Sequence, residues 1–349
     1  MMMKTILCGL VIAAGLLAGA PALYAADVKD LVKQLGSVKE EERAQAILEL
    51  RKMGEAAREA LSKIEVTETL EPQQLLLVRK LLGEFLIVQT PLKPMDLSTL
   101  TPFGEDKEKK VEGNPNLFTN KDKKIIALNG EFALEQGALE FLIVTKGPNA
   151  RLHETVVAVY ARPRDICWAL LACAYTYAGE LGEDGKINLP KDAGVMISVQ
   201  FEWEVPHAKM SDTETPGAEK KTMRIPIEFC VWNSQTEKPM KRSPFAFTGS
   251  KFEKDPETKK MVFKADEEKS IVAVKSDPFA IMNTPLDMKD VDPQHGAGYS
   301  VNRHVLPKRG YKCVVVFEPW VGGELKKEDV KDTGNRAAAP APPPTPVQQ

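Results

Sequence analysis

Apolar residues recur every three or four positions in the first part of the chain. Across 28–88, Leu, Ile, Met and Ala at these spacings alternate with Glu, Lys and Arg, which predicts amphipathic helices. Ser37, followed by Glu40, predicts a capping box at a helix start. Gly54 predicts a break between two helices, and Pro72 predicts the first turn of a further one.

After residue 120 the pattern changes to short apolar and alternating runs, which are typical of strands. These runs occupy 124–128, 138–144, 196–203, 224–232 and 313–317. Pro226 lies inside one run and predicts an edge or bulged strand. One helix is predicted from Pro163, with Ile166 and Leu170 on its common apolar face, ending before Gly179. A mainly β region with one principal helix, after a short helical segment, predicts the α+β class.

The remaining segments have no such periodicity. Residues 1–26 combine Lys4, an apolar run and small residues ahead of Asp27, which is typical of a signal peptide cleaved between Ala22 and Ala26. The alternative of a membrane anchor needs about 20 apolar residues, more than this run has. The predicted organisation is therefore a signal peptide at 1–26, a helical segment at 27–88, a linker at 89–120, an α+β domain at 121–320 and a disordered Pro- and Ala-rich tail at 321–349.

Export places the mature protein in the periplasm or outside the cell, with no transmembrane helix after cleavage. Lys and Arg total 47 against 49 Asp and Glu, a net charge of -2, so the chain lacks the basic excess that binds nucleic acid. After removal of Cys8 with the signal, four cysteines remain, and none forms a Cys-x-x-Cys pair. Cys230 and Cys313 are the better pair if a disulfide forms, but free buried thiols are equally expected.

Motifs of known catalytic sites are absent from the sequence. His153 and Glu154 begin like a zinc-protease motif, but Val157 stands where the second histidine is needed. As adjacent strand residues they would face opposite sides, so one could face the interior while the other faces solvent or a cleft. The favoured alternative is structural: His153 donates to a backbone carbonyl and Glu154 pairs with a lysine or arginine, which fixes the strand. His207, His295 and His304 are each expected to be solvated, although two that converge could bind zinc or copper.

Two resemblances to known families add to this interpretation. The stretch from Leu31 to Leu61 resembles a HEAT-type helical repeat. The stretch from about Leu139 to Pro319 resembles the YdjY-type domain, a family of exported bacterial domains without an established activity. The matching residues, in chain order, are His153 to Val156, Ala169 to Leu171, Glu202 and Trp203, Lys238 to Met240, Phe245 to Ser250, Ala265 and Asp266, Asp277 and Pro278, and Val301 and Asn302, followed by Pro307 and Gly310.

The candidate binding residues are His153, Glu154, Asp266 and Asn302. No catalytic residue, metal site or cofactor is assigned. The expected function is a non-catalytic interaction or scaffold module of the cell envelope, whose partner is another envelope protein. The alternative is a metal-assisted hydrolase that uses His153, Glu154 and Asp266, and it requires these three side chains to converge.

Overall fold

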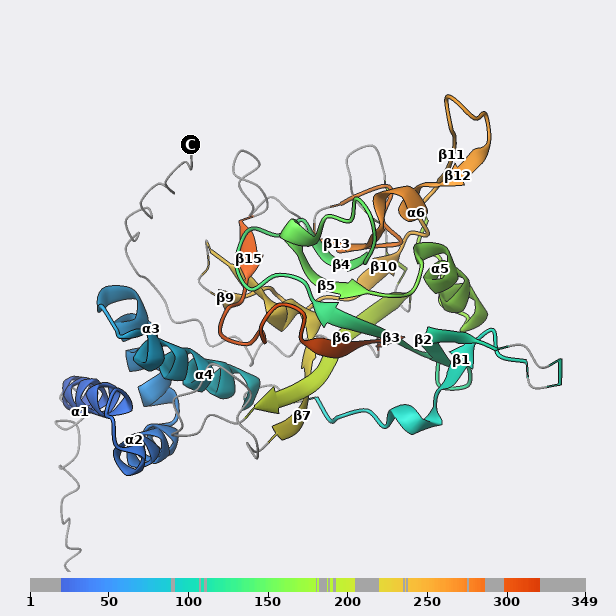
Figure 1. Ribbon diagram of the computed structural model, residues 1–349. Coiled ribbons are helices and arrows are strands. Elements are labelled where there is room, and N and C mark those ends of the chain that lie inside the picture. Colours follow the sequence, from blue (N-terminus) through green and yellow to red (C-terminus); the bar gives the residue numbers. More distant parts are fainter. Residues whose placement is uncertain are drawn as a thin grey trace, which may run out of the picture.

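The structure is a computed structural model of the chain (Figure 1). It describes residues 20–88, 92–106, 108–109, 112–179, 181, 187, 189–190, 193–204, 220–234, 236, 238–274, 276–285 and 298–320, with the side chains of 20–26, 87–88 and 204 excepted. The predicted tail at 321–349 and the first 19 residues of the predicted signal peptide lie outside this part of the chain.

Four helices form the N-terminal unit: α1 (Ala20–Leu35), α2 (Glu40–Met53), α3 (Glu55–Thr67) and α4 (Pro72–Val88). The predicted break is confirmed, because Gly54 separates α2 from α3 with a φ of 57°, a conformation that glycine adopts without strain. Pro72 is the first residue of α4, as predicted. The helices bury a core of their own, which includes Leu35, Leu50 and Leu81.

The predicted capping box of Ser37 and Glu40 is wrong in detail. The N-cap of α2 is Lys39 and its side chain makes no capping bond. Ser37 lies two residues earlier, where its hydroxyl accepts a hydrogen bond from the Lys39 amide at 3.1 Å and donates one to Glu42 at 2.6 Å. Ser37 therefore orders the turn before the helix and bonds Glu42 rather than Glu40.

The rest of the described chain is mainly β, which confirms the α+β class. The strand β3 pairs with both β16 and β5, and this closes eight strands into a barrel-like ring. In order around the ring they are β3 (Ile125–Phe132), β16 (Lys312–Pro319), β6 (Gly194–Glu204), β10 (Phe245–Phe247), β14 (Met282–Asn283), β13 (Ser270–Ala273), β4 (Phe141–Thr145) and β5 (Thr155–Val159).

Other strands extend the ring or lie beside it. The strands β1 (Thr101–Phe103) and β2 (Asn114–Asn120) continue the sheet from β3, and β7 (Lys220–Pro226) pairs with β6. Two small sheets are formed by β11 (Phe252–Lys254) with β12 (Met261–Phe263), and by β15 (Tyr299–Val301), β8 (Val231–Asn233) and β9 (Lys238–Pro239).

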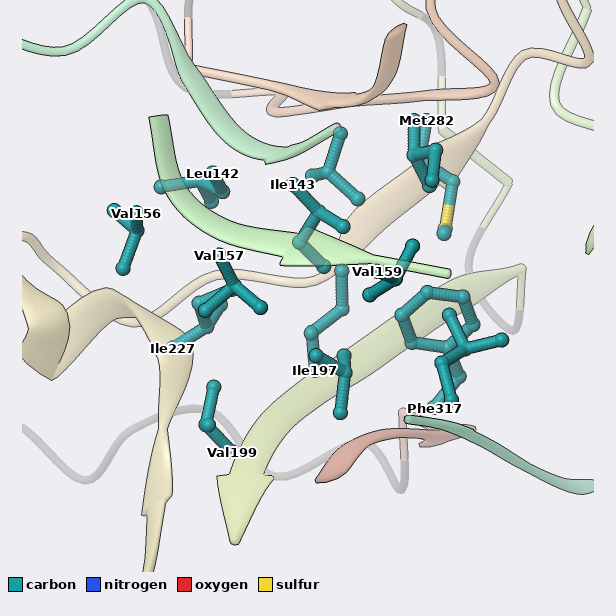
Figure 2. Close-up of a cluster of buried hydrophobic side chains, with 14 of the residues drawn as sticks. Leu142, Ile143, Val156, Val157, Val159, Ile197, Val199, Ile227, Met282 and Phe317 are labelled. Carbon is teal, nitrogen blue, oxygen red and sulfur yellow. The ribbon is translucent and has the colours of Figure 1, made fainter. Parts of the chain in front are cut away.

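The principal helix of this domain is α5 (Pro163–Ala172), which begins at the predicted proline. Its inner face, Ile166, Ala169 and Leu170, packs into the main hydrophobic core. Strands far apart in the sequence meet in the same core, as the cluster in Figure 2 shows for Val157 and Phe317. A shorter helix, α6 (Lys264–Glu268), lies beside α5 (Figure 1).

Two sequence predictions differ from the structure in this domain. The run 224–232 is not one strand: β7 ends at Pro226, and a 3-10 turn, η3 (Ile227–Cys230), leads into β8. Proline lacks the amide that would continue the ladder, so the strand ends there. The segment 89–120, predicted as a linker, contains η1 (Leu97–Thr99), β1 and β2, and therefore contributes to the sheet.

The helical unit is docked on the β domain. The buried Leu86 of α4 belongs to the main core rather than to the helical one. A Cβ atom at Gly83 would lie 1.8 Å from the carbonyl oxygen of His304, so glycine permits the close approach of α4 to this loop. The Glu65 carboxylate of α3 lies 2.9 Å from the Arg303 guanidinium. These contacts place the helices and the barrel-like ring in one packed structure.

Candidate functional site

His153 and Glu154 are not strand residues. They belong to a 3-10 turn, η2 (Leu152–Glu154), that precedes β5. The argument that adjacent strand residues face opposite sides therefore does not apply to them. The His153 side chain is 80% exposed, and its Nε2 lies 3.9 Å from Glu154 Oε2. The histidine is thus a surface side chain, and it does not anchor β5.

Glu154 instead belongs to a charged cluster around Arg151. The guanidinium lies 3.5 Å from Glu140, 3.6 Å from Glu154 and 3.7 Å from Glu268. It also covers the Phe141 ring, 4.1 Å from the ring centroid. One arginine thus holds together η2, the start of β4 and the end of α6. This arrangement agrees with the structural role that the sequence favoured for Glu154.

Asp266 holds the N-terminus of α5. Its carboxylate accepts a hydrogen bond from the Arg164 amide at 3.0 Å and pairs with the Arg164 guanidinium at 3.0 Å. The N-cap residue of α5, Arg162, makes no side-chain capping bond. Asp266 therefore supplies the missing acceptor from a distant part of the chain, where a negative charge also favours the helix dipole.

Asn302 is a buried connector. Its side chain, in a residue only 1% exposed, donates to the Phe229 carbonyl at 2.8 Å and accepts from the His304 amide at 3.3 Å. Its own amide donates to the Cys230 carbonyl at 2.9 Å. Asn302 thus fixes the loop after β15 to η3, and the partners in all three hydrogen bonds are backbone groups of the fold.

The predicted site residues therefore each bond a different partner. Asp266 faces Arg164, Glu154 faces Arg151, and Asn302 bonds the backbone of η3. Among the residues that the structure describes, no group of three or more His, Cys, Asp or Glu side chains could hold a metal ion. The alternative of a metal-assisted hydrolase required the side chains of His153, Glu154 and Asp266 to converge. No contact among the described residues favours it.

His304 is not the solvated histidine that was expected. Its Nε2 lies 3.5 Å from Glu65, its side chain is 14% exposed, and its Nδ1 has no hydrogen-bond partner within the described chain. Burial lowers the pKa of His304, although the nearby Glu65 carboxylate opposes this shift. The other two histidines of the zinc or copper alternative, His207 and His295, lie outside the described residues.

A second cluster of buried polar side chains contains Glu228 of η3. Burial raises the pKa of this carboxyl to about 7, against weaker opposing effects that include the Ser243 amide and Arg242. The Ser243 amide donates to Glu228 Oε1 at 3.2 Å. Glu228 Oε2, Arg242 Nε and Ser243 Oγ are buried without hydrogen-bond partners in the described part of the chain. Unpaired buried groups of this kind cost stability.

The four cysteines are free thiols. Cys173, Cys230 and Cys313 are buried and Cys167 is half-buried. Burial raises the pKa of the Cys167 thiol to about 11 and that of Cys230 well above its usual value, so neither is a reactive thiolate at neutral pH. The free-thiol alternative agrees with the structure, and the Cys230–Cys313 bond is not formed.

The outer face of α5 carries large apolar side chains that sequence reasoning did not single out. Trp168 is 56% exposed and Leu171 is 47% exposed, one helical turn apart on the same face. Three more large apolar side chains, Tyr177, Phe252 and Met261, are exposed nearby in the fold. The signal in the sequence is that α5 has apolar residues on both faces, whereas a helix that only covers a core needs one.

Comparisons with models of protein families, with curated proteins and with solved structures gave no match. The resemblances to the YdjY-type domain and to HEAT repeats therefore stay predictions from the residues quoted for them.

Proposed function

We propose that the protein is an exported, non-catalytic interaction module that binds another envelope protein. One observation carries the proposal: a group of exposed apolar side chains, here called the α5 surface, which consists of Trp168, Leu171, Tyr177, Phe252 and Met261. Single exposed apolar residues are common in proteins, whereas a group of large ones is typical of an interaction site.

The members of the α5 surface come from neighbouring elements. The Cys167 thiol of α5 lies 3.9 Å from the Gly249 carbonyl, and Tyr177 lies against the same glycine. The chain then runs from Gly249 directly into β11, which carries Phe252. Figure 1 shows α5, α6, β11 and β12 together on one side of the molecule. Helix α5 and Tyr177 therefore meet at Gly249, three residues before Phe252.

Basic side chains border this surface. Arg162 and Arg164 lie at the start of α5, and Lys124 donates to the Ala174 carbonyl just after its end. Asp165 and Asp266 neutralise the two arginines, which leaves Lys124 as an excess positive charge. Charge complementarity favours a partner segment that combines apolar side chains with acidic ones.

The position of the helical core is compatible with cleavage of the predicted signal peptide. The predicted signal peptide ends at Ala26, and the side chains of Val28, Val32 and Leu35 in α1 are buried in the core of the helical unit. Cleavage between Ala22 and Ala26 would keep all three of these contacts. In the described chain no helix has both the length and the apolar character needed to cross a membrane.

Photo-crosslinking in the native host tests the proposal. A photoreactive amino acid replaces Leu171 in one variant and Leu48 of α2 in a matched control, since these leucines are 47% and 46% exposed. We expect a discrete adduct with another protein from position 171 and none from position 48. An adduct with lipid, an adduct with a second copy of the chain, equal adducts from both positions, or no adduct at all would reject the proposal.

A further inference from the structure

A groove lies on the outer face of the sheet, and none of its lining residues belongs to the α5 surface. It has a volume of about 420 Å³, within the usual range for small-molecule sites, about 300–1,000 Å³. Its lining residues come from β2, β3, β6, β7, β16, η1 and the end of β5: Leu97, Asn116, Asn129, Gly130, Tyr160, Gln200, Phe201, Glu202, Thr222, Lys312, Cys313 and Val314.

The groove arises where β3 changes partners. Along Ile125–Leu128, β3 pairs with β2, and along Gly130–Phe132 it pairs with β5. Between these stretches, the Asn129 carbonyl accepts from the Tyr160 amide at 3.1 Å, and its side chain donates to the Pro115 carbonyl at 3.2 Å. The two neighbouring strands diverge at this residue, and the hollow opens between them.

The floor and one wall are fixed by backbone pairing. Val314 stands in register with Asn129 on β3 and with Gln200 on β6, so its side chain lies between two amides on one face. The Gln200 amide group bonds both backbone groups of Met95, at 2.7 Å and 3.2 Å. These bonds hold down the segment that carries Leu97, a second apolar lining residue.

Four charged groups at the groove sum to zero, namely the ammonium groups of Lys312 and Lys146 and the carboxylates of Glu131 and Glu202. Lys312 donates to Glu131 at 2.7 Å and to the Tyr160 hydroxyl at 2.5 Å, and Lys146 pairs with Glu131 at 2.5 Å. Burial alone would raise the pKa of Glu131, but hydrogen bonds from Lys146, Lys312 and the Tyr160 hydroxyl lower it to about 2. Glu131 is therefore ionised at neutral pH and pairs with both ammonium groups.

The opposite wall carries Glu202, which accepts a hydrogen bond from the Thr222 hydroxyl at 2.7 Å. This carboxylate disfavours an anionic ligand, while Lys312 and Lys146 disfavour a cationic one. A peptide strand could not pair with β16 or at Asn129, because β16 pairs on both sides and Asn129 already bonds Tyr160. These features favour a neutral ligand that both donates and accepts hydrogen bonds.

We infer that this groove binds a neutral, hydroxyl-rich ligand, namely a mono- or disaccharide. Sugar hydroxyls donate to Glu202 and to the side-chain carbonyl of Asn129, and they accept from Lys312. The C–H face of the ring lies on Val314 and Leu97, the apolar side chains of the groove. The inference is independent of the proposed function, since the two sites share no residue.

Saturation-transfer NMR on the full chain tests this inference. The probes are glucose, galactose, N-acetylglucosamine, maltose and cellobiose, with glycylglycine and inorganic phosphate as probes of the other ligand classes. We expect saturation transfer to at least one sugar and to neither of the other probes. Glu202→Gln should weaken sugar binding about tenfold, since it removes a charge-assisted hydrogen bond.

Thr222→Val is the second variant, because it removes the hydroxyl that orients Glu202 with little change in shape. Glu253→Gln on β11 is the matched control and should bind sugar as the wild type does. Transfer to no sugar, transfer that the two groove variants leave unchanged, or transfer to phosphate or glycylglycine instead of a sugar would overturn the inference.

Discussion

Glu65 of α3 and Arg303, in the loop after β15, form an ion pair with 2.9 Å between Oε1 and Nη2. The glutamate side chain is only 2% exposed, and Arg79 of α4 approaches the same oxygen at 2.9 Å. One buried carboxylate therefore holds two helices against the β domain. Arg79 belongs to the helical unit and Arg303 to the β domain, and the two would repel each other without Glu65. We therefore expect the helical unit and the β domain to unfold together.

Glu65→Gln should lower the free energy of unfolding by about 1–3 kcal/mol, less than for a fully buried pair because both arginines are partly exposed. Glu68→Gln, at the residue that follows the same helix, is the control, since its ion pair with Lys29 is on the surface, and it should change stability by less than about 1 kcal/mol. Urea unfolding measures both variants. Equal losses of unfolding free energy in the two variants would show that the ion pairs of Glu65 do not join the helical unit to the β domain.

His304 should make stability depend on pH. Because burial lowers its pKa in the folded state, the unfolded chain binds the proton more tightly. The contribution of His304 is therefore present above the usual pKa of 6.5 and is lost as the pH falls below it. His304→Gln should reduce this loss on acidification, whereas His153→Gln, at an exposed position, should not. Identical pH profiles for wild type and His304→Gln would refute this prediction.

Glu228 should make stability depend on pH in the opposite direction to His304. Its folded pKa of about 7 lies above the usual 4.5, so its contribution is full below 4.5 and is lost as the pH rises through about 7. Glu228→Gln removes the ionisation, and the variant should gain on the order of 3 kcal/mol relative to wild type between about pH 4.5 and about pH 8. Urea unfolding at the two pH values measures the gain, and a pH-independent difference would exclude a buried titrating carboxyl.

Asp266 and His153 should differ sharply when replaced. Asp266→Ala removes the acceptor at the start of α5 and should cost about 1 kcal/mol of unfolding free energy. His153→Ala removes an exposed side chain and should change stability by less than about 0.5 kcal/mol. Thermal melts of the two variants compare them directly. A larger loss for His153→Ala would restore the anchoring role first expected of this histidine.

The helices α2 to α5 and the strands β3, β4, β6 and β16 could be predicted because local pattern determined them. Gly54 and Pro72 act within one or two residues, and the alternation in 196–203 reports the buried face of β6. The strands β1 and β2 were missed because Thr101–Phe103 is short and Asn114–Asn120 is polar, so their partner β3 decides their conformation. The ring closure at Gly130 is likewise a tertiary event that no local pattern contains.

The partners of the candidate residues were not visible in the sequence, nor was the exposure of His153. Asp266 meets Arg164 across about a hundred residues of chain, and Asn302 bonds the backbone of η3. These contacts depend on how the ring closes rather than on motif spacing. The outer face of α5 was overlooked because only the core-facing residues of this helix, such as Ile166 and Leu170, were considered.

Hydroxyl-radical footprinting tests the central claim, that the α5 surface is covered by a protein partner in the native host. Oxidation of Leu171 and Leu48 is compared between the purified protein and the protein in intact cell envelopes, because the two leucines are 47% and 46% exposed. We predict that Leu171, Trp168 and Tyr177 are protected in the envelope and that Leu48 is oxidised equally in both samples. Equal oxidation of Leu171 in the two samples would contradict the proposed function.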